Sequence, residues 1–140
     1  MANASSGVGV EDDCKLKFLD LKNKRAYPWI IFKVDDAKGI VVVERLGKAD
    51  EDYEVLRAAL PENDCRYLVY DYNFVTEDNC QKSKIFFIAW SPDTSPVRRK
   101  MIYATSKDRF RRELDGVQLE IQATDQTEID IDELKSRANR

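Results

Sequence analysis

The sequence predicts a single α/β domain in which helices cover both faces of a mixed five-stranded sheet. Three observations favour this fold class. The chain has 140 residues, of which 43% are hydrophobic and 35% charged, as is typical of one folded domain. Helix and strand patterns alternate along it. The two strongest strand patterns, at 65–72 and 84–90, are apolar on both sides, as in a sheet with two covered faces.

The chain begins with small and polar residues. Residues 1–10 are expected to form a flexible N-terminal segment ahead of a domain at 11–140. Asp12 and Asp13 can cap a first helix, because apolar residues recur after them at helical spacing. Pro28 bars this helix from continuing.

A β-hairpin and a short helix follow. β-Branched and aromatic residues fill 29–34 and 40–46, and the residues between these two strands are of turn type. Asp50 or Asp52 then caps a short helix, which Pro61 stops.

The second half of the chain has the stronger strands. After the strands at 65–72 and 84–90, Ser95 and Pro96 fit an N-cap and the first position of a helix. This long helix is predicted over residues 97–114.

The C-terminal part is expected to hold a strand at 117–121 and a final helix that Thr127 caps. One face of this helix carries Ile131, Leu134 and Ala138. The element order is therefore α-β-β-α-β-β-α-β-α, which fits a three-layer sandwich with the sheet in the middle. The order of the strands within the sheet stays open.

The sequence contains no histidine, which excludes several kinds of active site. A Ser-His-Asp or Cys-His nucleophile, a His-ligated zinc ion and an imidazole base are all impossible. The cysteines are odd in number and widely spaced, and they are Cys14, Cys65 and Cys80. They predict buried thiols rather than a disulfide framework or a Cys₄ zinc site. We expect no metal, no cofactor and no enzyme, but a protein that acts by binding.

An enzymatic alternative would pair the carboxylate of Asp71 with that of Glu77 or Asp78. Nothing in their spacing singles them out, and acidic loop residues are usually solvated.

No segment of the sequence predicts a transmembrane helix or a signal peptide. The longest apolar runs, at 40–43 and 85–90, are too short to cross a bilayer, and the N-terminus has no apolar core. We expect a soluble, intracellular monomer.

Charge is distributed unevenly along the chain. Residues 97–112 carry seven cations and one anion, a net +6, and residues 15–25 carry five cations and one anion, a net +4. Because the net charge of the whole chain is −3, the remainder carries −13. This layout favours an oriented encounter with an acidic partner, although basic runs on helices are often only solvated faces. The acidic overall balance disfavours nucleic acid as that partner.

The basic helix also has apolar residues on more than one side. Val97, Met101 and Ala104 share one sector, while Tyr103 lies on another. One side must pack on the sheet, so the second is a candidate contact surface. Met101 fits that surface and a place in the core equally well.

Several long segments closely resemble one protein family. They are KIFFIAWSPD at 84–93, VRRKMIYATSKD at 97–108 and QATDQTEIDIDELKSRA at 122–138, together with the opening MANASSGVGVEDDCKLKFLDLK. These segments resemble the plant branch of the actin-depolymerising factor (ADF)/cofilin family, and the resemblance covers essentially the whole chain. It implies one actin-depolymerising-factor-homology domain.

The resemblance also implies a function. Members of this family bind actin monomers and filaments, prefer ADP-actin, and sever and depolymerise filaments. One alternative is an ADF-like binder that mainly stabilises or bundles filaments. Another is a gelsolin-like or twinfilin-like module, although such modules usually occur in longer or repeated chains.

The binding residues of the family correspond to particular positions of this sequence. The surface for monomers and filaments would comprise the N-terminal segment with Ser6, and Arg98, Lys100 and Met101. The surface for filaments alone would comprise Lys82, Lys135 and Arg137. Without the family, the second group would be interpreted as an edge charge and two cations near a helix C-terminus.

The resemblance implies two regulators as well. Ser6 matches the phosphorylation site at which a kinase switches binding off, while Ser5 beside it leaves the choice of hydroxyl open. A phosphate adds about −1.5 to −2 charges, which would repel an acidic actin surface. Phosphatidylinositol bisphosphate would compete with actin for a basic cluster, namely Arg98, Arg99 and Lys100.

The sequence departs from the family in two places. Tyr27-Pro28-Trp29 stands where relatives usually carry a basic residue next to an aromatic one. Relatives often carry the histidines that this chain lacks, so we expect severing to change little between about pH 6 and 8. The expected location is the cytoplasm and the actin cytoskeleton, with nuclear entry through the basic run at 22–25 as a further option.

Overall fold

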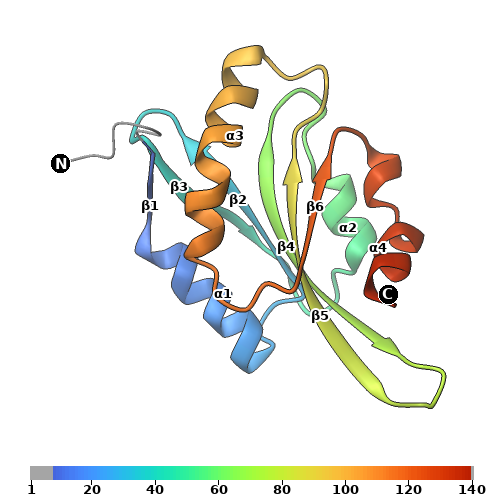
Figure 1. Cartoon of the computed structure of the whole chain (residues 1–140). Coiled ribbons are helices and arrows are strands. Elements are labelled where there is room, and N and C mark those ends of the chain that lie inside the picture. The colour runs from blue at the N-terminus through green and yellow to red at the C-terminus, as the bar shows by residue number, and fades with distance from the viewer. Residues whose placement is uncertain (1–7, 140) are drawn as a thin grey trace.

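The computed structural model describes residues 8–139 as a six-stranded sheet between two layers of helices (Figure 1). Residues 1–7 and 140 lie outside the described part of the chain. The strands are β1 (Gly9–Val10), β2 (Trp29–Asp35), β3 (Ile40–Leu46), β4 (Arg66–Val75), β5 (Gln81–Trp90) and β6 (Leu119–Ala123). The helical elements are α1 (Asp12–Lys24), α2 (Tyr53–Ala58), α3 (Val97–Arg112), a 3₁₀ turn η1 (Gln126–Ile129) and α4 (Ile131–Ala138).

The sheet is mixed, as predicted, and its strand order is β1-β3-β2-β4-β5-β6. The central strands pair antiparallel, whereas the edge strands β1 and β6 pair parallel with β3 and β5. The sixth strand, β1, uses Gly9 and Val10, the last two residues of the expected N-terminal segment. The Gly9 N–H donates to the Gly39 carbonyl at 3.0 Å. Two residues are too few for an alternating pattern, so the sequence gives no sign of this strand.

Helices cover both faces of the sheet, as the doubly apolar strands predict (Figure 1). Phe18 of α1 and Phe110 of α3 are fully buried on one face. Leu56 of α2 and Leu134 of α4 are fully buried on the other. Each such burial stabilises the fold by about 1.5–3 kcal/mol. Adjacent residues of β5 therefore point into different helix layers, which is why that strand is apolar at every inner position.

The predicted start of α3 is wrong by one residue. Pro96, not Ser95, occupies the N-cap, and it makes no side-chain cap bond. Ser95 instead donates its backbone N–H to the Pro92 carbonyl at 2.9 Å, so the turn before the helix uses its backbone. Of the two candidates at α2, Asp52 is the cap, and its carboxylate accepts the N–H of Glu54 at 3.1 Å.

The predicted cap of the last helical segment is also wrong. Asp125, not Thr127, occupies this position, and its carboxylate accepts the N–H groups of Thr127 and Glu128 at 2.9 and 3.3 Å. A carboxylate makes a stronger, charge-assisted bond than a hydroxyl does. These bonds begin η1, and α4 follows with Asp130 at its N-cap. The strand before them, β6, lies two residues later than the predicted strand at 117–121.

The β4–β5 hairpin projects from the body of the molecule (Figure 1). Its ladder runs from the Arg66–Trp90 pair out to the Val75–Gln81 pair. Both strands are longer than predicted, because the outer residues are mostly polar and exposed and so carry no apolar strand pattern.

Candidate functional site

The first candidate surface is an exposed ridge along α3. Val97 is 70% exposed and Met101 is 61% exposed, and Arg98 and Ala104 are exposed beside them. The opposite side of the helix packs on the sheet through Tyr103, Ser106 and Phe110. The prediction of a second apolar face on this helix is confirmed, and a core position for Met101 is ruled out.

Three consecutive cations at the start of α3 have different surroundings. Arg98 is exposed, and the Lys100 Nζ donates to the Asp93 carbonyl at 2.8 Å. The Arg99 side chain is only 17% exposed, and it pairs with Asp64 at 3.0 Å and with Asp36 at 2.6 Å. Of the three residues that the resemblance assigns to a lipid, Arg99 is thus the one most engaged within the fold.

The contacts of Arg99 anchor the start of α3. Its guanidinium lies 5.2 Å from the ring centroid of Tyr103, whose hydroxyl accepts the Val34 N–H of β2 at 2.8 Å. Burial raises the pKa of Asp64, but hydrogen bonds from Arg99 and Arg66 outweigh it and hold that pKa below its usual value. Asp64 is therefore ionised at neutral pH, and this network keeps the ridge of α3 turned outward.

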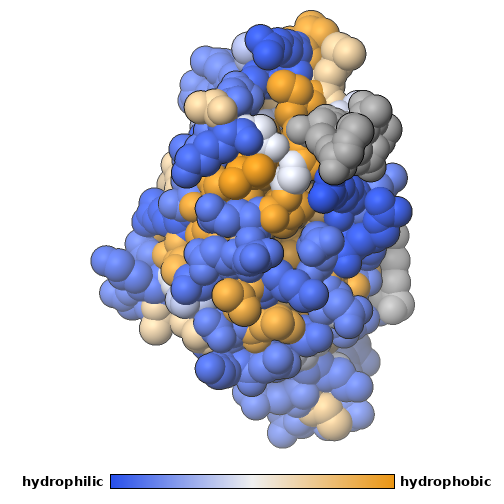
Figure 2. All heavy atoms as spheres, turned by 90° about the vertical axis from the view of Figure 1, so that its left-hand side faces the viewer, coloured by the Kyte–Doolittle hydropathy of each residue, from blue (hydrophilic) through white to orange (hydrophobic). Residues whose placement is uncertain are grey.

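The start of the described chain lies beside α3. The Arg109 Nη1 donates to the Val8 carbonyl at 3.0 Å, and β1 continues from there along β3. Ser5 and Ser6 fall outside the described residues, so their roles stay predictions. Figure 2 shows the side of the molecule on which α1, α3 and β1 lie, where apolar atoms gather in the upper half among hydrophilic ones.

The second candidate surface lies on the other face of the sheet, with α4. Lys82 is an exposed residue of β5, and alternation along the strand puts it on the same side as Phe86, which packs in the α2 and α4 layer. On α4, Lys135 is exposed and Arg137 is half-buried. The structure thus brings these three cations to one layer and separates them from the ridge of α3, which packs on the opposite face.

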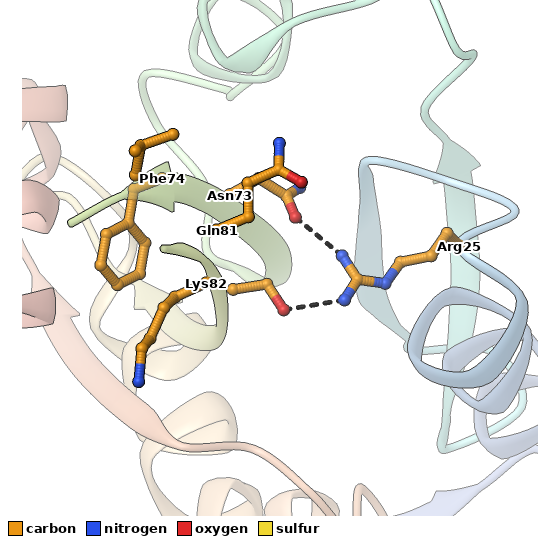
Figure 3. A pocket seen from close by; sticks show the side chains of 7 residues that line it. Arg25, Asn73, Phe74, Gln81 and Lys82 are labelled. Atoms are coloured by element: carbon orange, nitrogen blue, oxygen red, sulfur yellow. Dashed lines mark hydrogen bonds between the residues drawn. The ribbon is translucent and has the colours of Figure 1, made fainter. Parts of the chain in front are cut away.

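Sequence reasoning missed Arg25. It ends α1, and its guanidinium donates to Asn73 at 2.7 Å and to Ser83 at 2.8 Å, across an open pocket of about 440 Å³ (Figure 3). It also pairs with Asp71 at 3.0 Å. The sequence contains one indication of this contact. Asp71 lies inside the predicted strand at 65–72, and a buried charge needs a partner. The identity of that partner depends on the tertiary fold.

The carboxylate pair of the enzymatic alternative gains no support. Asp71 is buried at the base of the hairpin and faces Arg25, whereas Glu77 and Asp78 lie in the β4–β5 turn. Asp78 there accepts a hydrogen bond from the Thr76 hydroxyl.

Residues 8–139 hold neither a candidate metal site nor a candidate membrane span. Their side chains form no group of three or more His, Cys, Asp or Glu that could hold a metal ion. Within the same range, every helix is too short or too polar to pass through a bilayer.

The family model of cofilin/tropomyosin-type actin-binding proteins matches residues 7–139 of the chain. The chain belongs to this family. Actin-depolymerizing factor 7 of Oryza sativa subsp. japonica is 64% identical over 139 residues, which are 99% of this chain and 100% of that protein. Actin-depolymerizing factor 7 of Arabidopsis thaliana is also 64% identical, over 99% of both chains.

Solved structures of cofilins and related proteins share the fold. The crystal structure of a cofilin from Streptomyces griseoflavus superposes with a TM-score of 0.88 at 35% identity, over 96% of this chain and 98% of the other. Actin depolymerization factor 2 of Plasmodium berghei gives a TM-score of 0.78 at 31% identity, over 96% and 94%. The predicted ADF/cofilin fold is confirmed, with one more strand than expected.

Proposed function

We propose that this ADF/cofilin family member binds actin monomers and filaments, prefers ADP-actin, and severs and depolymerises filaments. Membership of a family of actin-binding proteins and the names of its relatives, actin-depolymerizing factors, support this function. The observation in the molecule that carries it is the ridge of α3, where two large apolar side chains stand exposed beside cations. No observation favours the alternative that the protein mainly stabilises or bundles filaments.

The ridge suits an acidic partner with an apolar cleft. Met101 supplies a contact that becomes buried on binding, and Arg98 and Lys100 supply charge that steers and orients the encounter. We assign the binding of monomers and filaments to these three residues together with the N-terminal segment that contains Ser6.

Lys82, Lys135 and Arg137 make the second, filament-specific contact in this proposal. They lie on the face opposite to α3, so the two surfaces can contact two neighbouring subunits at once, which a filament offers and a monomer does not. If both contacts fit a twisted filament better than the resting one, binding shifts the filament toward the twisted state. That differential affinity supplies the free energy for severing.

A kinase that phosphorylates Ser6 would switch binding off, and Ser5 is the alternative acceptor. What supports this proposal is that Val8, two residues later, contacts Arg109 on the helix that carries the ridge. A phosphate of about −1.5 to −2 charges near that ridge would repel an acidic partner.

Phosphatidylinositol bisphosphate would compete with actin at Arg98, Arg99 and Lys100. Arg98 is the most available of them, whereas Arg99 would have to leave Asp64 and Asp36 to reach a headgroup. We therefore expect Arg99 to contribute least to lipid binding.

We further propose that the protein acts by binding alone, without catalysis, in the cytoplasm on the actin cytoskeleton. A further proposal is nuclear entry through the basic run at 22–25. Lys22 donates to the Asp115 carbonyl, Lys24 pairs with Asp20 and Arg25 pairs with Asp71, so each of the three cations of that run has a partner within the fold.

Co-sedimentation with actin filaments and a monomer-binding titration test the proposal. The wild type should pellet with filaments and raise the unpolymerised fraction, whereas Arg98→Ala/Lys100→Ala should do neither. The control Lys15→Ala/Lys48→Ala removes two exposed cations, one on α1 and one just after β3, that belong to neither proposed surface, and it should behave as the wild type. Inactive wild type would refute actin binding, and an active Arg98/Lys100 variant would refute only the site. Ser6→Asp and Ser5→Asp decide which hydroxyl is the switch.

A further inference from the structure

The outer part of the β4–β5 hairpin extends beyond the helices. From Asn73 and Ser83 outward, its ladder projects into solvent, and Val75, Gln81 and Lys82 are all exposed (Figure 1). A two-stranded ribbon is only marginally stable in water on its own. Phe74 packs back on Tyr72 on one face of the hairpin, and a polar contact from outside the hairpin would restrain its outer part, and with it Lys82, further.

Arg25 makes that contact. Its Nη1 donates to the Asn73 Oδ1 at 2.7 Å and its Nη2 to the Ser83 Oγ at 2.8 Å (Figure 3). Asn73 and Ser83 are partners on one rung of the ladder, so a single guanidinium holds both strands. Across the described range 8–139, Arg25 is the residue outside the hairpin that hydrogen-bonds to its outer part, residues 73–83.

The base of the hairpin is fixed by the same side chain. The Arg25 Nη1 also donates to the Asp71 Oδ2 at 3.0 Å. Asp71 is only 6% exposed, and its second carboxylate oxygen is buried without a hydrogen-bond partner among the described residues. Removing the guanidinium would leave this buried charge uncompensated, so the contact resists being broken.

The backbone of Arg25 supports a role for its side chain. The residue ends α1 with φ 54° and ψ 35°, in the left-handed region. Glycine is the usual residue at such a position, because a Cβ is disfavoured there. The backbone of the arginine is therefore more strained at this position than that of a glycine would be. The contacts of its side chain offset this conformational cost.

The position of Lys82 depends on the clamped rung. The next rung outward pairs Phe74 with Lys82, and Figure 3 shows both side chains pointing away from Arg25. Because Lys82 is bonded directly to Ser83, a change in the orientation of the Asn73–Ser83 pair also changes the direction of the Lys82 side chain.

We propose that Arg25 is a positioning residue for filament binding: it clamps the hairpin and so fixes the direction of Lys82, without touching actin. This inference rests on the filament role proposed for Lys82. Monomer binding, which uses the ridge of α3, involves none of the clamped residues and should not depend on Arg25.

Arg25→Gly is the decisive variant, because the better fit of glycine to the left-handed backbone offsets part of the cost of leaving Asp71 unpaired, and a urea titration verifies that the variant is folded. We expect filament affinity to fall about threefold to tenfold, the usual cost of ordering a free segment on binding, with monomer affinity unchanged. Arg25→Lys keeps the charge but cannot bridge both strands, and should show a similar loss. Lys24→Ala removes the neighbouring cation, whose side chain is 76% exposed, and should change nothing.

A spin label reports the clamp directly. Cys80 in the hairpin turn is exposed while Cys14 and Cys65 are buried, so a nitroxide reagent labels Cys80 selectively. Its spectrum should sharpen in Arg25→Gly and stay unchanged in Lys24→Ala.

Lys82→Ala distinguishes the filament role proposed for Lys82 from the positioning role proposed for Arg25. If Arg25 acts through Lys82, Arg25→Gly should add little to the loss already caused by Lys82→Ala in the double variant. Normal filament binding by Lys82→Ala would refute both the filament assignment and the role of Arg25. Three results would refute the role of Arg25 alone. The first is weak filament binding by Lys82→Ala together with normal filament binding by Arg25→Gly. The others are an equal loss of monomer binding in Arg25→Gly and an unchanged nitroxide spectrum.

Discussion

Gly47, just after β3, occupies a place where no larger residue fits. A Cβ there would lie 2.6 Å from Cε2 and 2.9 Å from Nε1 of Trp29. The indole cannot withdraw, because it is fully buried and its Nε1 donates to the Glu51 carbonyl at 2.9 Å. We expect Gly47→Ala to lower the free energy of unfolding by about 1–3 kcal/mol, the usual cost of overpacking, in a urea titration followed by circular dichroism.

Gly9 provides the matched control for this substitution. The nearest atom to a Cβ at Gly9 is Cγ2 of Ile40, at the ordinary contact distance of 3.4 Å. Gly9→Ala should therefore change the free energy of unfolding by less than about 0.5 kcal/mol. Equal midpoints for the two variants would contradict the steric argument.

Residues whose role is local could be predicted, and those whose role depends on distant partners could not. Pro61 and Asp52 act on their own helix: the sequence identifies Pro61 and narrows the cap to Asp50 or Asp52, although the caps predicted at Ser95 and Thr127 are each displaced by one or two residues. Arg25 acts on residues that lie 46 to 58 positions away, which only the assembled sheet brings near. Arg99 likewise meets Asp36 across 63 positions.

At the scale of elements, a substitution on the exposed side of α3 can weaken binding without changing the stability of the fold. Met101 is 61% exposed, so Met101→Ser should change the free energy of unfolding by less than about 0.5 kcal/mol. It should nevertheless weaken monomer and filament binding about tenfold, because it removes an apolar side chain that the partner would bury. A fluorescence titration with labelled monomers and filament co-sedimentation measure the two affinities.

Leu16 on α1 is the control for this prediction. It is 58% exposed, so Leu16→Ser removes a comparable apolar side chain from a helix outside the proposed surface. Its two affinities should match those of the wild type. A loss shared equally by both variants would mean that general surface hydrophobicity, and not the ridge of α3, governs binding.

Elements were predictable where their apolar pattern matched their burial. The strands at 65–72 and 84–90 follow from runs that are apolar on both sides, and the helical spacing of α3 gives a candidate second apolar face without deciding the place of Met101. The outer part of the β4–β5 hairpin could not be predicted in this way, because it is exposed to solvent and carries no apolar pattern. Strand β1 could not be predicted either, because two residues are too few to show a period. The cations proposed to bind filaments, Lys82, Lys135 and Arg137, carry no pattern either, so only resemblance assigns them that role.

At the scale of the whole molecule, charge and apolar surface act together. The basic start of α3 and the cations of α4 lie on opposite faces of one rigid sheet. A partner bound at one face therefore leaves the other face free for a second partner. This geometry suits a protein that contacts two neighbouring subunits of a filament and whose affinity depends on how they are arranged.

The stability of the whole fold should depend on pH through its carboxylates. Hydrogen bonds lower the pKa of Asp125 and of Glu128, chiefly from the hydroxyls of Thr127 and Thr124. Such groups bind fewer protons in the folded than in the unfolded chain, so their contribution is present above the unfolded pKa and is lost as pH falls through the folded pKa. Burial raises the pKa of Asp71 against the opposing effect of Arg25, so the contribution of Asp71 declines as pH rises.

Near neutral pH the response should be flat. The sequence has no His, the side chain that ordinarily titrates between about pH 6 and 8. We expect the free energy of unfolding and the severing rate to stay constant over this range, and stability to fall below about pH 5 as the carboxylates with lowered pKa protonate. Thermal unfolding of the protein alone and severing of labelled filaments, at matched pH values, measure the two. A steep change in severing with a flat unfolding curve would place the titrating group on actin, whereas a steep change in both would contradict the prediction.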